Sequence, residues 1–307
     1  MRVLLLLGAA GLVVGAAPAK KPLTPTELVK AAPPAAPVRS PGDAVKAAPA
    51  SDWIEIPAGD LLVMDLAGAK RVVIQLAPQF APVHVENIRT MARSGYWAKA
   101  TIYRVVDNWI TQWGLGDGPF ATPPGVVERP PEEYQRGSAG LTLMPMGSPD
   151  PYSAMAAYAD GWPVALQVGG TVNSTYCYGA VGVARDAAPD TGNGSELFAV
   201  IGATARRLDR NYALVGRVVD GMDNLSALPR GTAEMGVYAK DQAPTPIVAV
   251  RIAADMPAAE RPRFEFLRTG SPAFADYVQL ASHRADYGVA SPGAALCAVP
   301  VPIRKKP

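Results

Sequence analysis

Short apolar segments separated by turn-forming residues occupy residues 52–112 and recur in residues 180–252. The segments DWIEI, LLVMDL and RVVIQL have the length of strands, alternate or run apolar, and are separated by Pro-Ala-Gly and Gly-Ala-Lys turns. From Pro82 to Gly95 the apolar spacing changes to that of a helix, with proline in its first turn and glycine as its stop. The pattern therefore predicts a folded region of short strands with a helix between them.

The stretch TIYRVVDNWITQWG, residues 101–114, holds two strand-like runs on either side of Asp107 and Asn108. Asp and Asn favour a turn because their side chains bond the local backbone. Arg104 and Gln112 lie eight positions apart, so strand alternation can place both on one face. An arginine on an apolar sheet face is unfavourable unless something binds it, which makes Arg104 the first candidate for function.

The N-terminal part of the chain differs in composition from the folded region. Residues 1–19 combine a basic start, an apolar core and an Ala-Pro-Ala end, so we expect a signal peptide and export to a bacterial periplasm. An uncleaved segment that anchors the chain in the membrane is the alternative, although the apolar run is short for a membrane span. Residues 20–50 are rich in Ala, Pro and Lys, which predicts a disordered tether, with a marginal helix at 24–32 as its alternative.

Charge and cysteine content exclude several classes of function. A formal charge of +2 without a basic cluster in the folded region argues against nucleic-acid binding. Two cysteines and two histidines are too few for a zinc site of the usual spacing, so we expect no metal. Cys177 and Cys297 could form a disulfide in an oxidising compartment, although the sequence does not show whether they lie close together.

The strip at residues 101–114 resembles the active-site strip of the cyclophilins, the peptidyl-prolyl cis-trans isomerases. Three further blocks stand in the order of that family: VVIQLAPQFAPVHVENIRTMARSGYW at 72–97, GVARDAAPDTGNGSELFAVIG at 182–202 and LDRNYALVGRVVDGMDNL at 208–225. The resemblance covers most of residues 72–252. It implies a mainly β fold, a closed antiparallel β-barrel with helices capping its ends, in a domain spanning 51–253.

The resemblance also implies roles for particular side chains. Arg104 would donate hydrogen bonds to the twisted X-Pro amide, and Gln112 would orient Arg104 or hold the substrate carbonyl. The residues expected to bind the proline and its neighbours are Trp109, Ile110, Ala184, Arg185, Phe198, Leu208 and Tyr212. No nucleophile, titrating base or cofactor is required for such a rotation.

Two of these assignments have open alternatives. Phe198 could form the floor of the proline pocket or belong only to the barrel core. Arg185 stands where the family commonly has an asparagine whose backbone pairs with substrate, and the strand at 180–184 is expected to offer its edge to an extended peptide. Arg207 replaces an aromatic residue that binds cyclic-peptide inhibitors in the family, so we expect weak sensitivity to such an inhibitor.

Two regions depart from the family pattern. An insert at about 115–178 could contain barrel strands at 141–146 and 164–168 with a loop between them, and it either covers the rim of the cleft or is a surface elaboration. A C-terminal extension at 254–307 is expected to hold a strand at 264–267 and a helix at 271–285 that packs on the barrel. The disulfide, if formed, would tie this insert to the C-terminal tail.

The sequence therefore predicts a peptidyl-prolyl isomerase, or rotamase, that acts on proline-containing unfolded or extended polypeptides and assists folding of envelope proteins. The expected protein is a monomer without cofactors, with no stable membrane insertion after signal removal. A cyclophilin-like chaperone or scaffold with little turnover is the alternative, because Trp109, Ile110, Arg207 and Tyr212 depart from the commonest family residues. A barrel that binds a small envelope ligand is a more distant possibility.

Overall fold

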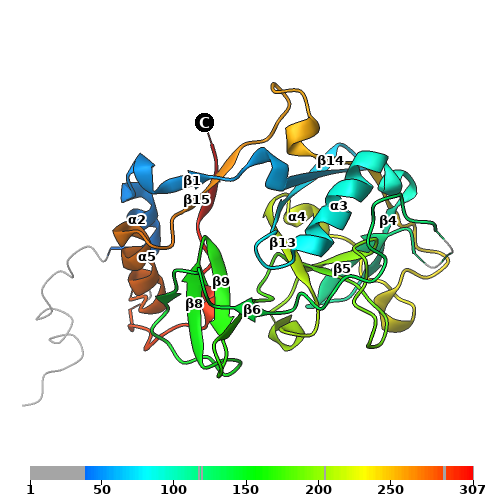
Figure 1. Ribbon diagram of the computed structural model, residues 1–307. Helices are drawn as coiled ribbons and strands as arrows, with labels where there is room; N and C mark the ends of the chain where they lie inside the picture. The colour runs from blue at the N-terminus through cyan, green and yellow to red at the C-terminus, as the bar shows by residue number, and fades with distance from the viewer. Residues whose placement is uncertain (1–38, 117, 119, 204, 286–287, 307) are drawn as a thin grey trace, which may run out of the picture. The chain divides into compact units, whose positions relative to one another are not determined.

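The computed structural model describes residues 39–307 except 117, 119, 204, 286–287 and 307, and Figure 1 shows its course. The predicted signal peptide and the predicted tether up to residue 38 lie outside the described residues. Within the described part of the chain, no helix is long and apolar enough to cross a membrane.

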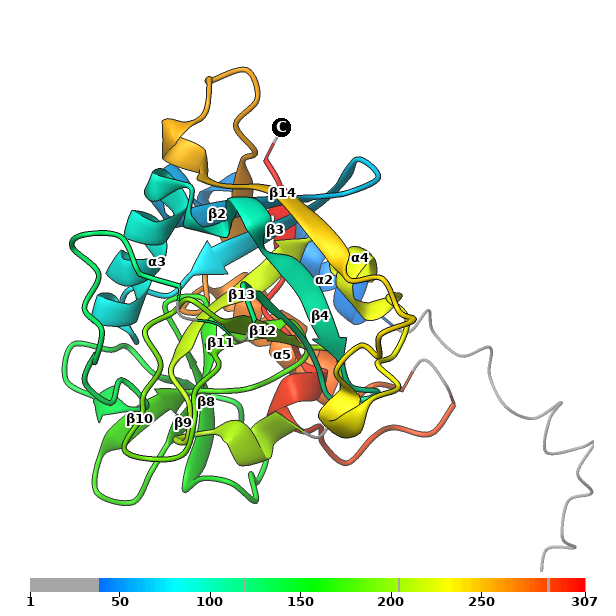
Figure 2. The ribbon, with the colours of Figure 1, turned by 90° about the vertical axis from the view of Figure 1, so that its right-hand side faces the viewer.

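Eight antiparallel strands close into a barrel in the order β11-β12-β5-β4-β14-β2-β3-β13, and Figure 2 shows several of them grouped around one axis. The predicted fold class is confirmed. The strands are β2 (Leu61–Leu66), β3 (Lys70–Leu76), β4 (Thr101–Val105), β5 (Ile110–Gly114), β11 (Ala180–Val183), β12 (Leu197–Val200), β13 (Leu214–Asp220) and β14 (Thr245–Ile252). Inward side chains of these strands fill the interior, so the barrel has a packed core.

Helix α3 (Pro82–Ser94) packs on the barrel core through Val85, Ile88 and Met91, as its apolar spacing predicts. Proline stands in its first turn, and Gly95 ends it in the left-handed conformation, with φ of 72°. A second helix, α4 (Asp223–Ser226), is a single turn after β13. Short 3-10 turns lie at Ala50–Asp52, Ala58–Asp60, Tyr96–Lys99, Ala205–Leu208 (η4), Glu234–Gly236 (η5), Ala253–Asp255 and Leu296–Ala298.

Glu133 of the insert caps the start of α3. Its carboxylate accepts the backbone N–H of Val83 at 2.9 Å and of His84 at 3.0 Å, and it lies 2.6 Å from the His84 ring nitrogen Nδ1. Burial by itself would raise the pKa of Glu133. The hydrogen bonds from His84 and Val83 lower the pKa by more than burial raises it, so the pKa lies below its usual range. The His84 ring is fully buried, and its contact with Glu133 joins α3 to the insert.

The insert forms its own five-stranded antiparallel sheet, in the order β6-β10-β9-β8-β7. Its strands are β6 (Arg136–Gly137), β7 (Met144–Pro145), β8 (Met155–Ala159), β9 (Trp162–Leu166) and β10 (Thr171–Ser174). The strands predicted at 141–146 and 164–168 overlap β7 and β9, but their placement in the barrel is wrong, and β8 lies inside the expected loop. The sequence of β8, MAAYA, has no simple alternation because both faces are buried, Ala157 and Ala159 toward the barrel and Tyr158 away from it.

An N-terminal helix and a helix of the C-terminal extension lie together on the outer face of this sheet. The end of the predicted tether is not disordered: Pro41–Ala47 form helix α2, whose start is fixed by a capping box between Ser40 and Asp43. Helix α5 (Pro272–Ser282) lies beside α2, and Phe274 and Tyr277 pack in the cluster that contains Tyr158. The prediction that this helix packs on the barrel is wrong, because the insert sheet already occupies that position.

A third, three-stranded sheet joins the N-terminal and C-terminal segments. Strand β15 (Phe264–Leu267) lies between β1 (Trp53–Glu55) and β16 (Ile303–Lys305), so the first predicted strand pairs with the C-terminal extension and not with the barrel. Cys177 and Cys297 form a disulfide, with their Cα atoms 5.1 Å apart. The disulfide and β16 tie the C-terminal tail to the insert and to the N-terminal segment.

Candidate active site

The hairpin β4–β5 brings Arg104 and Gln112 face to face. They are directly opposed in the strand register, and Arg104 Nη1 donates to Gln112 Oε1 at 2.9 Å. The turn between the strands contains Asn108 with φ of 50°, a conformation that Asn adopts more readily than most residues. The predicted turn chemistry therefore sets the register that pairs the two candidate catalytic side chains.

A β-bulge in β4 places Tyr103 on the same side as Arg104. The register with β5 shifts between Ile102 and Arg104, whereas Ile102 and Val105 both point into the barrel core. Strict alternation would have placed Tyr103 on the opposite face from Arg104. The sequence reasoning missed Tyr103 for this reason, because a bulge has no reliable local signature.

A chain of hydrogen bonds continues from Gln112 to a carboxylate. Gln112 Nε2 donates to the Tyr103 hydroxyl at 2.7 Å, and that hydroxyl donates to Glu196 Oε2 at 2.7 Å. The other carboxylate oxygen of Glu196 accepts the backbone N–H of Gly116 at 3.0 Å. The amide of Gln112 is therefore held at both ends, and its oxygen is directed at the guanidinium of Arg104.

The guanidinium is also held from the other side, by the loop that contains η5. Arg104 Nε donates to the carbonyl oxygen of Met235 at 2.8 Å, and the backbone of Arg104 makes an isolated bridge with Val237. Within the described part of the chain, no carboxylate forms an ion pair with Arg104 and its Nη2 has no hydrogen-bond partner. The side chain is thus oriented while part of its donor edge remains available.

These side chains line an open cleft of about 510 Å³. Every catalytic and substrate-binding residue expected from the sequence lines it: Arg104, Trp109, Ile110, Gln112, Ala184, Arg185, Phe198, Leu208 and Tyr212. The sequence reasoning missed five others: Tyr103, Gly116, Asp186, Met235 and Val237. The floor is apolar, since Ile110, Phe198 and Leu208 are buried, and the guanidinium of Arg104 stands at its polar side.

Phe198 serves both the cleft and the core. Its ring lines the cleft, meets Tyr212 edge-to-face at 5.9 Å, and stacks at 5.8 Å on Tyr176, which comes from the end of the insert. Gly182 permits this stack, because a Cβ there would lie 2.5 Å from Phe198 Cζ. Burial raises the pKa of the Tyr176 phenol well above its usual range. The insert therefore backs the floor of the cleft from below.

Two arginines lie against aromatic rings that line the cleft. The guanidinium carbon of Arg207 is 4.1 Å from the centre of the Trp109 ring, and that of Arg185 is 4.6 Å from the centre of the Tyr212 ring. Arg207, which replaces an aromatic residue of the family pattern, thus covers one face of Trp109. The contact gives the substitution a structural role at the cleft.

The expected free strand edge is wrong for most of residues 180–184. Strand β11 is paired on both sides, with β12 and β13, and the backbone N–H of Ala184 donates to the Glu196 carbonyl at 2.9 Å. Closure of the barrel removes the edge. The backbone of Arg185, just after the strand, makes no hydrogen bond within the described part of the chain, so its N–H and C=O groups remain available.

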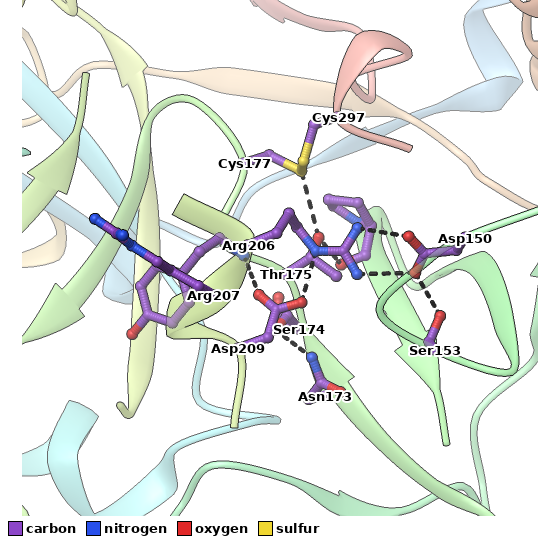
Figure 3. A network of polar contacts seen from close by, with 12 residues as sticks. Asp150, Ser153, Asn173, Ser174, Thr175, Cys177, Arg206, Arg207, Asp209 and Cys297 are labelled. Carbon is purple, nitrogen blue, oxygen red and sulfur yellow. Dashed lines mark hydrogen bonds and ion pairs between the residues drawn. A yellow bond between two sulfur atoms is a disulfide. The ribbon is translucent and has the colours of Figure 1, made fainter. Parts of the chain in front are cut away.

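Figure 3 shows a network of polar contacts in which Arg206 lies between Asp150 and Asp209. Arg206 in η4 bonds Asp209 at 2.6 Å and Asp150 of the insert at 2.9 Å, and Asp209 accepts the backbone N–H of Tyr176 at 2.9 Å. Burial raises the pKa of Asp209, whereas the bonds from Arg206 and Ser153 outweigh burial and lower that of Asp150. The network joins the turn that carries Leu208 to the insert.

Comparison with known proteins identifies the family of the barrel domain. The family model described as cyclophilin type peptidyl-prolyl cis-trans isomerase/CLD matches residues 61–253. Two curated relatives, each a probable peptidyl-prolyl cis-trans isomerase, from Brucella suis biovar 1 (strain 1330) and Brucella abortus (strain 2308), are 26% identical over 185 residues, which are 60% of this chain and 78% of each relative. The crystal structure of cyclophilin AquaCyp293 from Hirschia baltica has a similar fold, with a TM-score of 0.65 and 22% identity over 82% of this chain and 93% of that chain.

Proposed function

This chain belongs to the cyclophilin-type peptidyl-prolyl cis-trans isomerases, and from that premise we propose that the cleft around Arg104 is where it rotates X-Pro bonds. One observation carries the proposal: Gln112 and the Met235 carbonyl hold a guanidinium with unused donors beside an apolar pocket. The free donors would face the amide while the apolar floor holds the proline ring.

The chemistry is a rotation and needs no bond to form or break. Amide resonance gives the X-Pro bond a barrier of roughly 18–20 kcal/mol, so the uncatalysed rotation is slow. In the twisted amide the proline nitrogen regains a lone pair that can accept a hydrogen bond. Arg104 donates to that nitrogen or to the adjacent carbonyl oxygen, and its planar fork is fixed in place before the substrate arrives. Ile110, Phe198 and Leu208 hold the ring while the other side of the bond turns.

The test is an isomerisation assay on a proline tetrapeptide with wild type and Arg104→Ala. We expect kcat/KM to fall on the order of a hundredfold, by analogy with the loss of one preorganised donor at a transition state. Arg93→Ala is the matched control. Arg93 lies on α3 and forms an exposed ion pair with Asp255, and surface ion pairs contribute little to stability.

Wild-type turnover with no loss in Arg104→Ala would overturn the proposed role of this cleft. A wild type that suppresses aggregation of an unfolded client but does not accelerate isomerisation would instead favour the chaperone or scaffold alternative. Both readouts therefore belong in the same experiment, on the same preparations.

We further propose that the chain is exported to the periplasm and acts on proline bonds of folding envelope proteins. The signal-like pattern of residues 1–19 supports this proposal, and so does a disulfide, which persists in oxidising compartments. Cell fractionation with mass analysis of the mature N-terminus tests it. Recovery in the cytoplasm would refute export, and recovery in the membrane with residues 1–19 intact would favour the anchored alternative.

A further inference from the structure

A second cleft, of about 300 Å³, lies where the barrel, the insert and the C-terminal tail meet. It shares none of its lining residues with the cleft around Arg104 among the described residues. Its walls are largely apolar, with Trp162 and Leu214 on one side and Leu296 and Val301 of the tail on another. A cavity of this size is at the lower end of the range for small organic ligands.

Arg217 of β13 lines this cleft without a neutralising partner. Its Nε and Nη2 donate to Gln75 Oε1 at 2.9 and 2.7 Å, and its Nη1 donates to the carbonyl oxygen of Gly161 at 2.7 Å. The guanidinium carbon lies 4.4 Å from the centre of the Trp162 ring. Within the described part of the chain, no carboxylate pairs with Arg217, so its charge is uncompensated.

Burial lowers the pKa of Arg217 to about 9, so its guanidinium still carries its charge at neutral pH. Gln75 and a backbone carbonyl satisfy three of its N–H groups, which leaves one N–H each on Nη1 and Nη2. Arg217 is half-buried, and a charge removed in part from water without a counterion is unfavourable unless a ligand supplies one.

Ser174 provides a second, independent sign of a ligand. The residue is 6% exposed, its Oγ has no hydrogen-bond partner within the described part of the chain, and it lines the same cleft. Buried hydroxyl groups in proteins are normally paired. An unpaired hydroxyl and a guanidinium without a carboxylate partner in the described part of the chain therefore border one largely apolar cavity.

We propose that this cleft binds a small organic anion, a carboxylate on a hydrocarbon body, with the carboxylate on Arg217 and the hydrocarbon among the apolar walls. Charge complementarity selects the anion, because the guanidinium has donors to spare for a carboxylate oxygen. The lining by Leu296, Val301 and Trp162 selects an apolar body. The site is distinct from the isomerase cleft, and its occupant would stabilise the contact between tail and barrel.

The test uses decanoate and decanol as probes of the wild-type protein, by calorimetry and by NMR of the arginine Nε–Hε signals. We expect decanoate to bind at least about tenfold more tightly than decanol, because a charge-assisted hydrogen bond is roughly twice as strong as a neutral one. We also expect decanoate to shift the Arg217 signal, which is assigned by its absence in Arg217→Lys. The difference in affinity between decanoate and decanol is measured on the wild type alone, so it reports on charge without any variant.

Arg217→Gln should remove the preference for decanoate, and Arg217→Lys should keep part of it, with isomerase activity unchanged in both. Equal binding of decanoate and decanol by the wild type would overturn the proposal, as would no binding of either probe. A preference that survives in Arg217→Gln would overturn the role of Arg217. An apolar dipeptide acid that binds more tightly than decanoate would overturn the hydrocarbon occupant in favour of peptide carboxyl ends.

Discussion

The cleft around Arg104 and the outer layer, meaning the insert sheet with α2 and α5, are built in opposite ways. In the cleft the decisive pair, Arg104 and Gln112, lies across one hairpin and is separated by eight positions. In the outer layer the ties join distant segments: Arg39 bonds Asp276 across 237 positions, and the disulfide spans 120. The first kind of contact follows from local pattern, and the second requires the whole chain to fold.

The two regions are nevertheless coupled beneath the cleft. Tyr176 of the insert stacks on Phe198, and Arg206 joins Asp150 of the insert to Asp209 beside Leu208. Contacts from the insert therefore support Phe198 and Leu208, two residues of the active-site floor. Substitutions at these joints measure how far the outer layer determines the stability of the active-site floor.

The largest effect is expected from Arg206→Met. Arg206 is 6% exposed and bonds Asp150 and Asp209, so its loss leaves two buried carboxylates without their cation. We expect the free energy of unfolding to fall by about 3–5 kcal/mol in urea denaturation. Arg207→Met is the matched control, because the neighbouring side chain is exposed and makes no ion pair within the described residues.

Equal stability of Arg206→Met and Arg207→Met would show that the network does not hold the two regions together. A loss confined to hydrogen-exchange protection in the insert and α5, with barrel strands still protected, would sharpen the comparison by showing that the outer layer opens first.

The sequence predicted what local geometry determines. The residues expected at the active site line one cleft because they lie in strands and turns whose order matches a family pattern. Tyr103 was missed because a bulge shifts the alternation of β4, and Met235 because its contribution is a backbone carbonyl. Helix α2 was predicted to be disordered because a seven-residue helix is unstable alone and forms here against α5.

Removal of the disulfide by the pair Cys177→Ser and Cys297→Ser should have the next largest effect. The cross-link closes a long loop, and we expect a loss of about 2–4 kcal/mol in the free energy of unfolding. Hydrogen exchange should rise near Cys297 and in the insert more than in the barrel. Dithiothreitol should reproduce the loss in the wild type and add nothing in the double variant; a further loss in that variant would point to another cause.

Glu133→Gln tests the hydrogen bonds between the insert and the start of α3, for which we expect a smaller loss of stability. The carboxylate accepts bonds from Val83 and His84, and we expect a loss of about 2 kcal/mol at pH 7, as for hydrogen bonds to a charged group. The folded pKa of Glu133 is lowered, so its contribution is complete above the unfolded value, about 4.3 for Glu, and is lost as the pH falls through the folded value.

The pH profile of the difference between wild type and Glu133→Gln is the measurement. The difference in unfolding free energy should be constant near neutral pH and should shrink as the pH falls below about 4.3. A difference that grows on acidification would mean that the folded pKa of Glu133 is raised. Glu86→Gln on the same helix is the control, because the Glu86 side chain is 62% exposed.

The smallest effect is expected from Tyr176→Phe, and it separates the two regions most sharply. The Tyr176 hydroxyl is buried without a hydrogen-bond partner in the described part of the chain, so its removal should leave stability within about 1 kcal/mol or raise it. In Tyr158→Phe, on the outer face of the insert sheet, the lost hydroxyl donates to the Val299 carbonyl at 2.8 Å, and we expect a loss of about 1–2 kcal/mol. Isomerase activity should be unchanged in both, because Tyr176→Phe keeps the ring stacked on Phe198 and Tyr158 packs on Phe274, away from the cleft. A fall in kcat/KM for Tyr176→Phe alone would instead show that its hydroxyl acts on the cleft.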